Sequence, residues 1–277
     1  MSKEKIIFND RMPVDKGIGT MRENTKKYIG EFLGSAFISF WGLGLAVPMK
    51  VLGYVNSTFE VAIWFGIACA FSGIIFSPIS GAHCNSAVTL AQAVFGGFDK
   101  KLVLPYWLAQ ILGWSAGILP IYVMFDNVLD EWASETAINP GSFFYCSTPA
   151  DSLLAGAGVE MFMTAMLIFC VFLFADERIT SRPSPAASPW VIGIVISLNI
   201  AFGGGFTGTC INTTRDLGPR FVALIYGLLK GYDVSDIFAG GQWLMYVIAP
   251  TIGAVLGGVF YYGVIAKLLP EGESREK

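Results

Sequence analysis

Two asparagines, each following a short polar turn between long apolar runs, have the side-chain chemistry that most clearly suggests a binding role. Asn85 precedes residues 86–96 and Asn212 precedes residues 213–229, and each of these segments can form a short helix. At a helix N-cap, the asparagine oxygen accepts backbone N–H groups, while the amide nitrogen still offers donors. The sequence therefore predicts two helix starts that can present hydrogen-bond donors to a polar molecule.

A single arginine, Arg215, follows the second asparagine at the end of a stretch, residues 183–214, that contains no charged residue. A charge within an apolar stretch of membrane length is functional by default. We therefore expect Arg215 to have a functional role. The alternative is an ordinary arginine at the membrane interface.

The composition indicates a membrane protein. Of the 277 residues, 54% are hydrophobic and 14% are charged, and the mean hydropathy is +0.59. Soluble domains carry about 25% charged residues. The formal net charge is −3 and no basic stripe occurs, which excludes a nucleic-acid partner. The single histidine, His83, excludes a multi-histidine metal site, and the five cysteines lack metal-ligand spacing. We expect no enzyme, no metal site and no cofactor.

Six apolar runs are each long enough to cross a bilayer, which takes about 20 residues in a helix. These runs are residues 29–49, 59–77, 102–125, 152–175, one span within 183–214 and one within 237–266. Two polar tails flank them, residues 1–28 and 269–277. The first tail lacks the short apolar core of a signal peptide and is expected to be solvated.

The distribution of lysine and arginine predicts the orientation. Most of them lie in the two tails or in loops on the same side, whereas residues 51–58 and 126–151 contain none. An excess of basic residues marks the cytoplasmic side. We therefore expect a multi-pass protein of the plasma (cytoplasmic) membrane with both termini in the cytoplasm, which requires an even number of spans.

The chain contains an internal repeat. Glu31 precedes Asn85 by 54 residues, and Glu160 precedes Asn212 by 52 residues. The repeats are expected at about residues 29–125 and 152–266. Each holds three spans and one short helix, and because three is odd, the halves have opposite orientations in the membrane. This pattern predicts an all-α membrane protein, a single channel domain over residues 29–268, with six transmembrane helices and two re-entrant half-helices in an inverted repeat.

The two half-helix N-termini would then point at each other near the middle of the bilayer. Each carries roughly +0.5 charge from its aligned peptide dipoles. A positive potential at that depth repels cations, hydronium included. Loop carbonyls on one side and apolar side chains on the other suit neutral molecules with hydroxyl groups. Irregular backbone at this depth is tolerated where it lines a polar cavity or is buried in protein.

Residues 80–89, Ser-Gly-Ala-His-Cys-Asn-Ser-Ala-Val-Thr, resemble the first signature of the aquaporin (major intrinsic protein) family, and residues 207–220 resemble the second. The resemblance covers residues 28–268. Asp216 directly after Arg215 is typical of its glycerol facilitator (aquaglyceroporin) branch. The resemblance implies a passive channel in the lipid bilayer that excludes ions and protons and assembles as a homotetramer. Its expected solute is small and neutral, glycerol or a similar short polyol such as 1,2-propanediol, with or without water.

Three signature residues differ from the family. Ser86 and Thr213 stand where both signature prolines are expected, and Thr214 replaces the second alanine, whereas Ala87 keeps the first. Proline suits the first turn of a helix because its missing N–H has no partner there. Serine and threonine leave that N–H in place but can cap locally. We expect a changed midplane and an intact fold.

When the family's selectivity-filter positions are located by counting from the two asparagines, they correspond to Phe65, Ile200, Thr209 and Arg215. Trp64 lies beside the first of these positions. Ile200 stands where the glycerol branch has glycine and is expected to narrow the pore. Thr209 stands where that branch has an aromatic residue and is expected to widen the pore. The run of residues 203–205, three glycines, is expected to be a flexible connector or to turn carbonyls towards the pore.

The resemblance also implies residues that support the two half-helix loops: Glu31, Glu160, His83 and Asp216. In the family reading, each glutamate is buried and accepts backbone N–H groups of a loop. The alternative for Glu31 and Glu160 is a proton relay.

Three other functions stay open at this point. The channel could pass mainly water or another small uncharged solute. A coupled secondary transporter also uses inverted repeats and broken helices, although few charged groups are present to couple transport. An inert protein with altered signatures is the third possibility, and a permeability assay separates it from the others.

Overall fold

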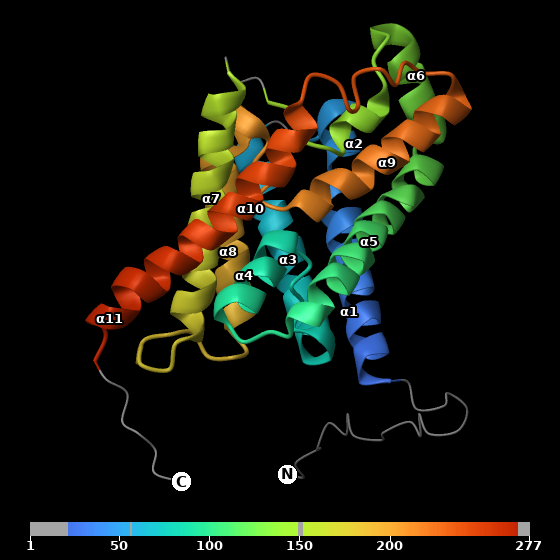
Figure 1. Ribbon diagram of the computed structural model, residues 1–277. Helices are drawn as coiled ribbons and strands as arrows, with labels where there is room; N and C mark the ends of the chain where they lie inside the picture. The colour runs from blue at the N-terminus through green and yellow to red at the C-terminus, as the bar shows by residue number, and fades with distance from the viewer. Residues whose placement is uncertain (1–21, 56, 149–151, 271–277) are drawn as a thin grey trace, which may run out of the picture.

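The computed structural model describes residues 22–55, 57–148 and 152–270, which contain helices and no strand. Six helical segments are long and apolar enough to cross a membrane, as predicted. They are Glu23–Lys50 (α1, η1 and α2), Thr58–Ser80 (α3), Lys100–Met124 (η2 and α5), Leu153–Ala175 (α7), Ser188–Thr207 (α8) and Gln242–Leu268 (α10, η4 and α11). Their order and directions are visible in Figure 1.

Side-chain caps and glycines determine where several helices begin and end. Ser57 and Glu60 form a capping box at the start of α3, and Ser152 accepts the N–H of Ala155 at the start of α7. These bonds satisfy backbone N–H groups that have no partner within the helix. Gly81 and Gly208 end α3 and α8 in the left-handed conformation, at φ 89° and 75°.

Small residues bring the spans into close contact. Gly113 and Gly117 of α5 face the carbonyls of α1, and Gly253 and Gly257 of α10 face the carbonyls of α7 in the same way. A β-carbon at any of these four positions would overlap a backbone oxygen of the neighbouring helix. The equal spacing in the two halves shows that the same helix crossing is built twice, as small-residue motifs allow in membranes.

The halves meet along α3 and α8. Gly66 lies against the backbone of Gly193, and Gly193 lies against the backbone of Gly66. This reciprocal contact relates corresponding spans of the two repeats.

Two shorter helices begin in the middle of the molecule. They are Ser86–Phe95 (α4) and Thr213–Lys230 (α9). Figure 1 shows α9 running from the middle towards α6 (Asp126–Thr136), whereas α4 lies nearer the end where α1 begins and α11 ends. The predicted half-helices therefore both form. The start of the first span and the end of the last span lie on the same side of the molecule.

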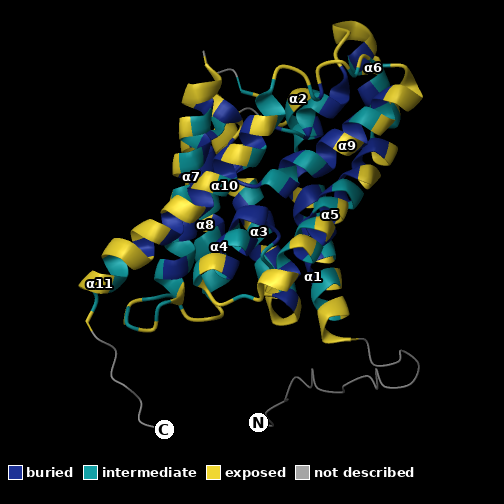
Figure 2. Ribbon diagram, in the orientation of Figure 1, coloured by how far each residue is buried: buried dark blue, intermediate teal, exposed yellow. Residues whose placement is uncertain are grey.

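Exposed residues occur along all the spans (Figure 2), and many of them are large and apolar. Large examples are Leu154, 80% exposed, and Val123, 79% exposed. Such faces suit contact with lipid tails rather than water.

Three features differ from the sequence expectations. Residues 203–205 are part of α8 and do not form a connector. A β-carbon on Gly203 would lie 2.8 Å from the Thr209 side chain, and one on Gly204 would lie 2.8 Å from the Thr58 side chain, so both positions favour glycine. The segment 126–151 contains an unexpected helix, Asp126–Thr136 (α6), and a short 3-10 helix, Pro140–Phe143 (η3). Helix α1 begins at Glu23, before the expected start at residue 29. The rest of the expected tails, residues 1–21 and 271–277, lies outside the described residues.

Candidate functional site

The two asparagines cap the half-helices. Asn85 Oδ1 accepts the N–H groups of Ala87 (2.8 Å) and Val88 (3.3 Å), and Asn212 Oδ1 accepts that of Thr214 (3.1 Å). Each amide nitrogen donates to the other loop: Asn85 Nδ2 to the Ile211 carbonyl at 3.0 Å, and Asn212 Nδ2 to a carbonyl of the first loop at 2.9 Å. The half-helix starts are therefore joined to each other.

The residues that replace the signature prolines and alanine also make hydrogen bonds. The Ser86 N–H donates to Asn212 Oδ1 at 3.1 Å, and the Thr214 hydroxyl donates to the same oxygen at 2.8 Å. The Thr213 hydroxyl turns away and donates to the Tyr246 carbonyl at 3.0 Å. The midplane is thus changed from the family pattern and remains closely connected.

Ala87 keeps the signature alanine and lies in an apolar contact. It is 2% exposed and packs in a cluster with Ala91, Ile168 and Ala254. The first turn of α4 is therefore fixed against α7 and α10, between the two halves of the chain.

Glu31 holds the loop before α4. Its carboxylate accepts the N–H groups of His83 (2.9 Å) and Cys84 (2.7 Å), the hydroxyl of Ser80 (2.7 Å) and the amide of Gln110 (2.8 Å). The glutamate is fully buried. A buried carboxylate with four donors is satisfied as an acceptor.

Glu160 holds the loop before α9 in the same manner. It accepts the N–H groups of Cys210 (2.9 Å) and Ile211 (2.8 Å) and the hydroxyl of Thr207 (2.6 Å). This glutamate is also fully buried. The two carboxylates thus occupy equivalent positions in the repeats.

The loops share an unusual backbone pattern. Ala82 and Cys84 have φ of 46° and 47°, and Thr209 and Ile211 have φ of 47° and 44°. Positive φ is uncommon for residues other than glycine and persists where surrounding contacts hold it. In both loops these residues stand three and one positions before the asparagine. The contacts of Glu31 and Glu160 with the loop N–H groups are what hold this conformation.

His83 packs beside the first loop. Its Nδ1 lies 3.2 Å from the Thr89 hydroxyl, and its ring contacts the rings of Phe98 and Tyr106. These contacts fix the side chain in the wall of the inner cavity described next.

Two cavities meet between the half-helix loops and the segment that follows α6. The inner cavity, about 570 Å³, is lined by both loops and by α3 and α8. The outer cavity, about 510 Å³, is lined by residues of α6, η3 and residues 145–147 as well as α3 and α8. Five residues line both cavities, and we name them the collar: Val61, Phe65, Ile200, Gly208 and Arg215.

Three of the four expected filter residues therefore lie together in the collar. The Arg215 guanidinium donates to the Phe144 carbonyl at 3.1 Å and lies 5.9 Å from the centre of the Phe65 ring. That ring stacks on Trp114, with 6.3 Å between centroids. The neighbouring Trp64 instead points outwards, 43% exposed, and donates to the Trp41 carbonyl.

Thr209, the fourth expected filter residue, lies differently. It lines the inner cavity only, and its side chain is buried. Its hydroxyl donates to the Asn199 carbonyl at 3.3 Å, in the space that Gly203 leaves open. The filter role of Thr209 therefore stays a prediction, and at the collar itself the loop contributes the backbone of Gly208.

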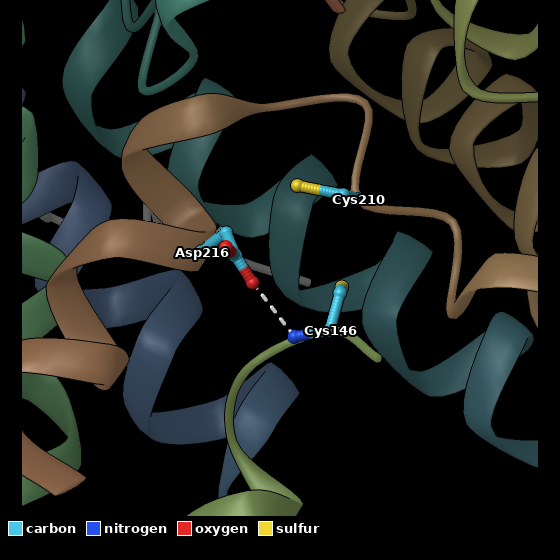
Figure 3. A group of neighbouring side chains, drawn as sticks. All are labelled: Cys146, Cys210 and Asp216. Atoms are coloured by element: carbon cyan, nitrogen blue, oxygen red, sulfur yellow. Dashed lines mark hydrogen bonds between the residues drawn. The ribbon is translucent and has the colours of Figure 1, made fainter. Parts of the chain in front are cut away.

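Asp216 connects α9 to the segment before α7. Its Oδ1 accepts the N–H of Cys146 at 2.7 Å, and its Oδ2 accepts from Arg220 at 2.6 Å. Arg220 also donates to the Cys146 carbonyl at 2.5 Å and to that of Ile237. Figure 3 shows Asp216 pointing from α9 towards Cys146. This buried network fixes the segment that carries Phe144, and therefore the position of Arg215.

Cys146, Cys210 and Asp216 have ligand atoms within 4.8 Å of one another, so that a metal site must be considered (Figure 3). Both carboxylate oxygens of Asp216 already have donors, and one donor is a guanidinium. A cation would lie beside that positive charge with two thiols as its remaining ligands. The group does not fit a metal ion.

Sequence reasoning missed Val61, Phe144 and Arg220. Val61 lies one helical turn before Phe65 on the same face of α3, a spacing that could have identified it. The roles of Phe144 and Arg220 depend on contacts with residues 71 and 74 positions away, for which the sequence carries no local signal.

Known proteins share this architecture. The family model Major intrinsic protein matches residues 20–261. A glycerol uptake facilitator protein of Haemophilus influenzae is 31% identical over 254 residues, covering 87% of this chain and 94% of the relative. The propanediol uptake facilitator PduF of Citrobacter freundii is 31% identical over 255 residues, covering 87% and 93%. The structure of the aquaglyceroporin from Plasmodium falciparum matches with a TM-score of 0.78 at 27% identity, covering 88% of this chain and 98% of that one. The chain therefore belongs to the major intrinsic protein family, in its aquaglyceroporin branch, whose members are channels and not enzymes.

Proposed function

We propose that the chain is a passive channel for small neutral solutes, with glycerol or a short polyol such as 1,2-propanediol as the solute. The observation that carries the proposal is the pair of cavities that meet at the collar, where an arginine faces apolar side chains. Arg215 can donate hydrogen bonds to hydroxyl groups, while Phe65 and Ile200 contact the carbon chain. The names of the similar facilitators support the same solute class.

In this proposal, each site residue has a defined role. Phe65, Ile200 and Arg215 select the solute, with Thr209 shaping the loop behind them. Asn85 and Asn212 cap the half-helices and present polar groups at the midplane. Glu31, Glu160, His83 and Asp216 support the loops. The part of the chain that forms this channel is the single domain of residues 29–268.

Ions and protons are excluded by the same arrangement. The N-termini of α4 and α9 meet, and their dipoles add to the charge of Arg215. Positive potential of this kind is one means by which pores exclude protons and cations. Glu31 and Glu160 have all of their described bonds to N–H and O–H donors of the protein, which favours support over a proton relay.

The protein is a multi-pass membrane protein, and we place both termini in the cytoplasm because the basic residues gather on that side. The bilayer proposed for it is the plasma membrane. The homotetramer is proposed by analogy with the family.

The test is solute entry into proteoliposomes, followed by light scattering after a jump in external solute. Glycerol and 1,2-propanediol are expected to enter faster than into empty liposomes, with a rate linear in concentration and unchanged by ion gradients. Saturating or gradient-driven uptake would indicate a coupled transporter. Rapid water flux without polyol flux would contradict the polyol assignment.

A further inference from the structure

The side chains of the collar are mostly apolar. Val61, Phe65 and Ile200 come from α3 and α8, and each lines both cavities. Val61 and Phe65 are four residues apart, so they share one face of α3. A solute that passes between the cavities therefore meets hydrocarbon from two helices.

Polar groups at the collar are few. Gly208 has no side chain and offers its backbone, and Arg215 offers N–H donors, one of which is used by the Phe144 carbonyl. The hydroxyl of Thr209, the next residue of the loop, is directed to the Asn199 carbonyl, and Thr209 is buried. The five collar residues thus contain no side-chain hydroxyl, amide or carboxylate that can accept a hydrogen bond.

A solute hydroxyl that leaves water needs a replacement partner. A hydroxyl placed against an apolar wall without one raises the free energy of passage, whereas a methyl group at the same wall lowers it. Glycerol has three hydroxyl groups, and 1,2-propanediol has two and a terminal methyl group. Both can place two adjacent hydroxyls against Arg215 and Gly208, but they differ in the group that meets the apolar side.

From these contacts we propose that the collar favours 1,2-propanediol and related methyl-terminated vicinal diols over glycerol, and that Val61 together with Ile200 determines this preference. The inference rests on the proposed channel function and names the solute class that the same site prefers. The expected preference is roughly fourfold in permeability, the factor that corresponds to burial of about one methylene group.

The experiment measures permeability to glycerol and to 1,2-propanediol in the same proteoliposomes, with the value for empty liposomes subtracted for each solute. The main variant is Val61→Thr, which keeps the branched shape and adds a hydroxyl. Its matched control is Val171→Thr, the same change at a residue that lines the inner cavity but not the collar. Ile200→Thr provides a second collar variant in case the first is unstable, and size-exclusion chromatography checks folding of all three.

The wild-type protein is expected to pass the diol about four times faster than glycerol. Val61→Thr and Ile200→Thr are expected to reduce this ratio at least twofold by raising glycerol permeability, while Val171→Thr leaves it unchanged. If both solutes enter well but glycerol is as fast as the diol, the preference is refuted and the channel function stands. If a folded collar variant and Val171→Thr give the same ratio as wild type, the assignment to Val61 and Ile200 is refuted. If neither solute exceeds empty liposomes, the proposed function itself fails, and the preference with it.

Discussion

The backbone N–H of Ser86 donates to the side-chain oxygen of Asn212 at 3.1 Å, which joins the first residue of one half-helix to the cap of the other. A proline at position 86 has no N–H and cannot form this bond. The substitution that departs from the family signature therefore supplies a connection across the midplane. The same oxygen accepts from the Thr214 hydroxyl, so Asn212 is the centre of the junction.

Thr214→Val is expected to weaken this junction. Valine keeps the shape of the side chain but removes the 2.8 Å bond to Asn212, and Thr214 is only 1% exposed. Loss of one buried hydrogen bond costs about 1–2 kcal/mol. Ser86→Ala keeps the backbone N–H and removes only a hydroxyl that lies 3.4 Å from the same oxygen, so its effect is expected to be smaller. Thermal unfolding in detergent compares the two, and equal melting temperatures would contradict the ranking.

Glu31→Gln and Glu160→Gln are expected to disturb the loops without affecting proton conduction. An amide places N–H donors against N–H groups that now donate to a carboxylate. Each change is expected to destabilise the protein by about 3 kcal/mol and to reduce polyol flux. A pH-sensitive dye inside liposomes measures the proton leak. A proton leak in wild type that either variant abolishes would support the relay instead.

Local chemistry explains why much of the fold was predictable. The starts of α4 and α9 follow directly from the capping ability of Asn85 and Asn212, and the six spans follow from uncharged length. Helix α6 was missed because its segment is short and polar and is held by distant residues. The inward turn of Thr209 was missed because Asn199 and the open space beside Gly203 determine it, and neither is visible in the spacing that located the filter.

Gly42→Ala is expected to narrow the collar by displacing the ring of Phe65. A β-carbon at position 42 would lie 2.9 Å from two carbons of the Phe65 ring, which is confined on its other side by Trp114. Overpacking of this kind costs about 1–3 kcal/mol and moves side chains. Gly205→Ala is the matched control, because a β-carbon there has no neighbour within 4 Å. Polyol flux is expected to fall in the first variant alone, and equal flux in both would show that Phe65 does not border the path.

The attachment of α6 to α9 is expected to depend on pH. Lys230 donates to Asp126 and Asp130, and the hydroxyls of Tyr226 and Tyr232 donate to the same carboxylates. The hydrogen bond from Lys230 lowers the pKa of Asp126, and the two aspartates raise the pKa of Lys230.

A carboxyl with a lowered pKa stabilises the attached state above its usual pKa, and this contribution is lost as the pH falls below about 4. Lys230 has a raised pKa, so its contribution to the attached state is present at low and neutral pH. This contribution is lost as the pH rises from about 10.4, the ordinary lysine pKa, through the raised value. A spin label at an exposed site of α6, Glu135→Cys, is expected to become mobile in acid and in strong base. In Lys230→Met the label is expected to be more mobile than in the parent at neutral pH and to lose its response to strong base. A label with unchanged mobility and unchanged response to base in that variant would contradict the account.

The most direct test of the central claim, that solute passes through the collar, is the size limit of Ile200→Gly. Ile200 is 7% exposed and lines both cavities, so its removal is expected to widen the collar and admit ribitol, which wild type rejects. Ile194→Gly carries the same helix penalty of about 1 kcal/mol at a residue that is 58% exposed on the outer face. Ribitol entry into proteoliposomes is therefore predicted for Ile200→Gly and not for Ile194→Gly or wild type. Unchanged exclusion of ribitol by folded, glycerol-conducting Ile200→Gly would contradict the account.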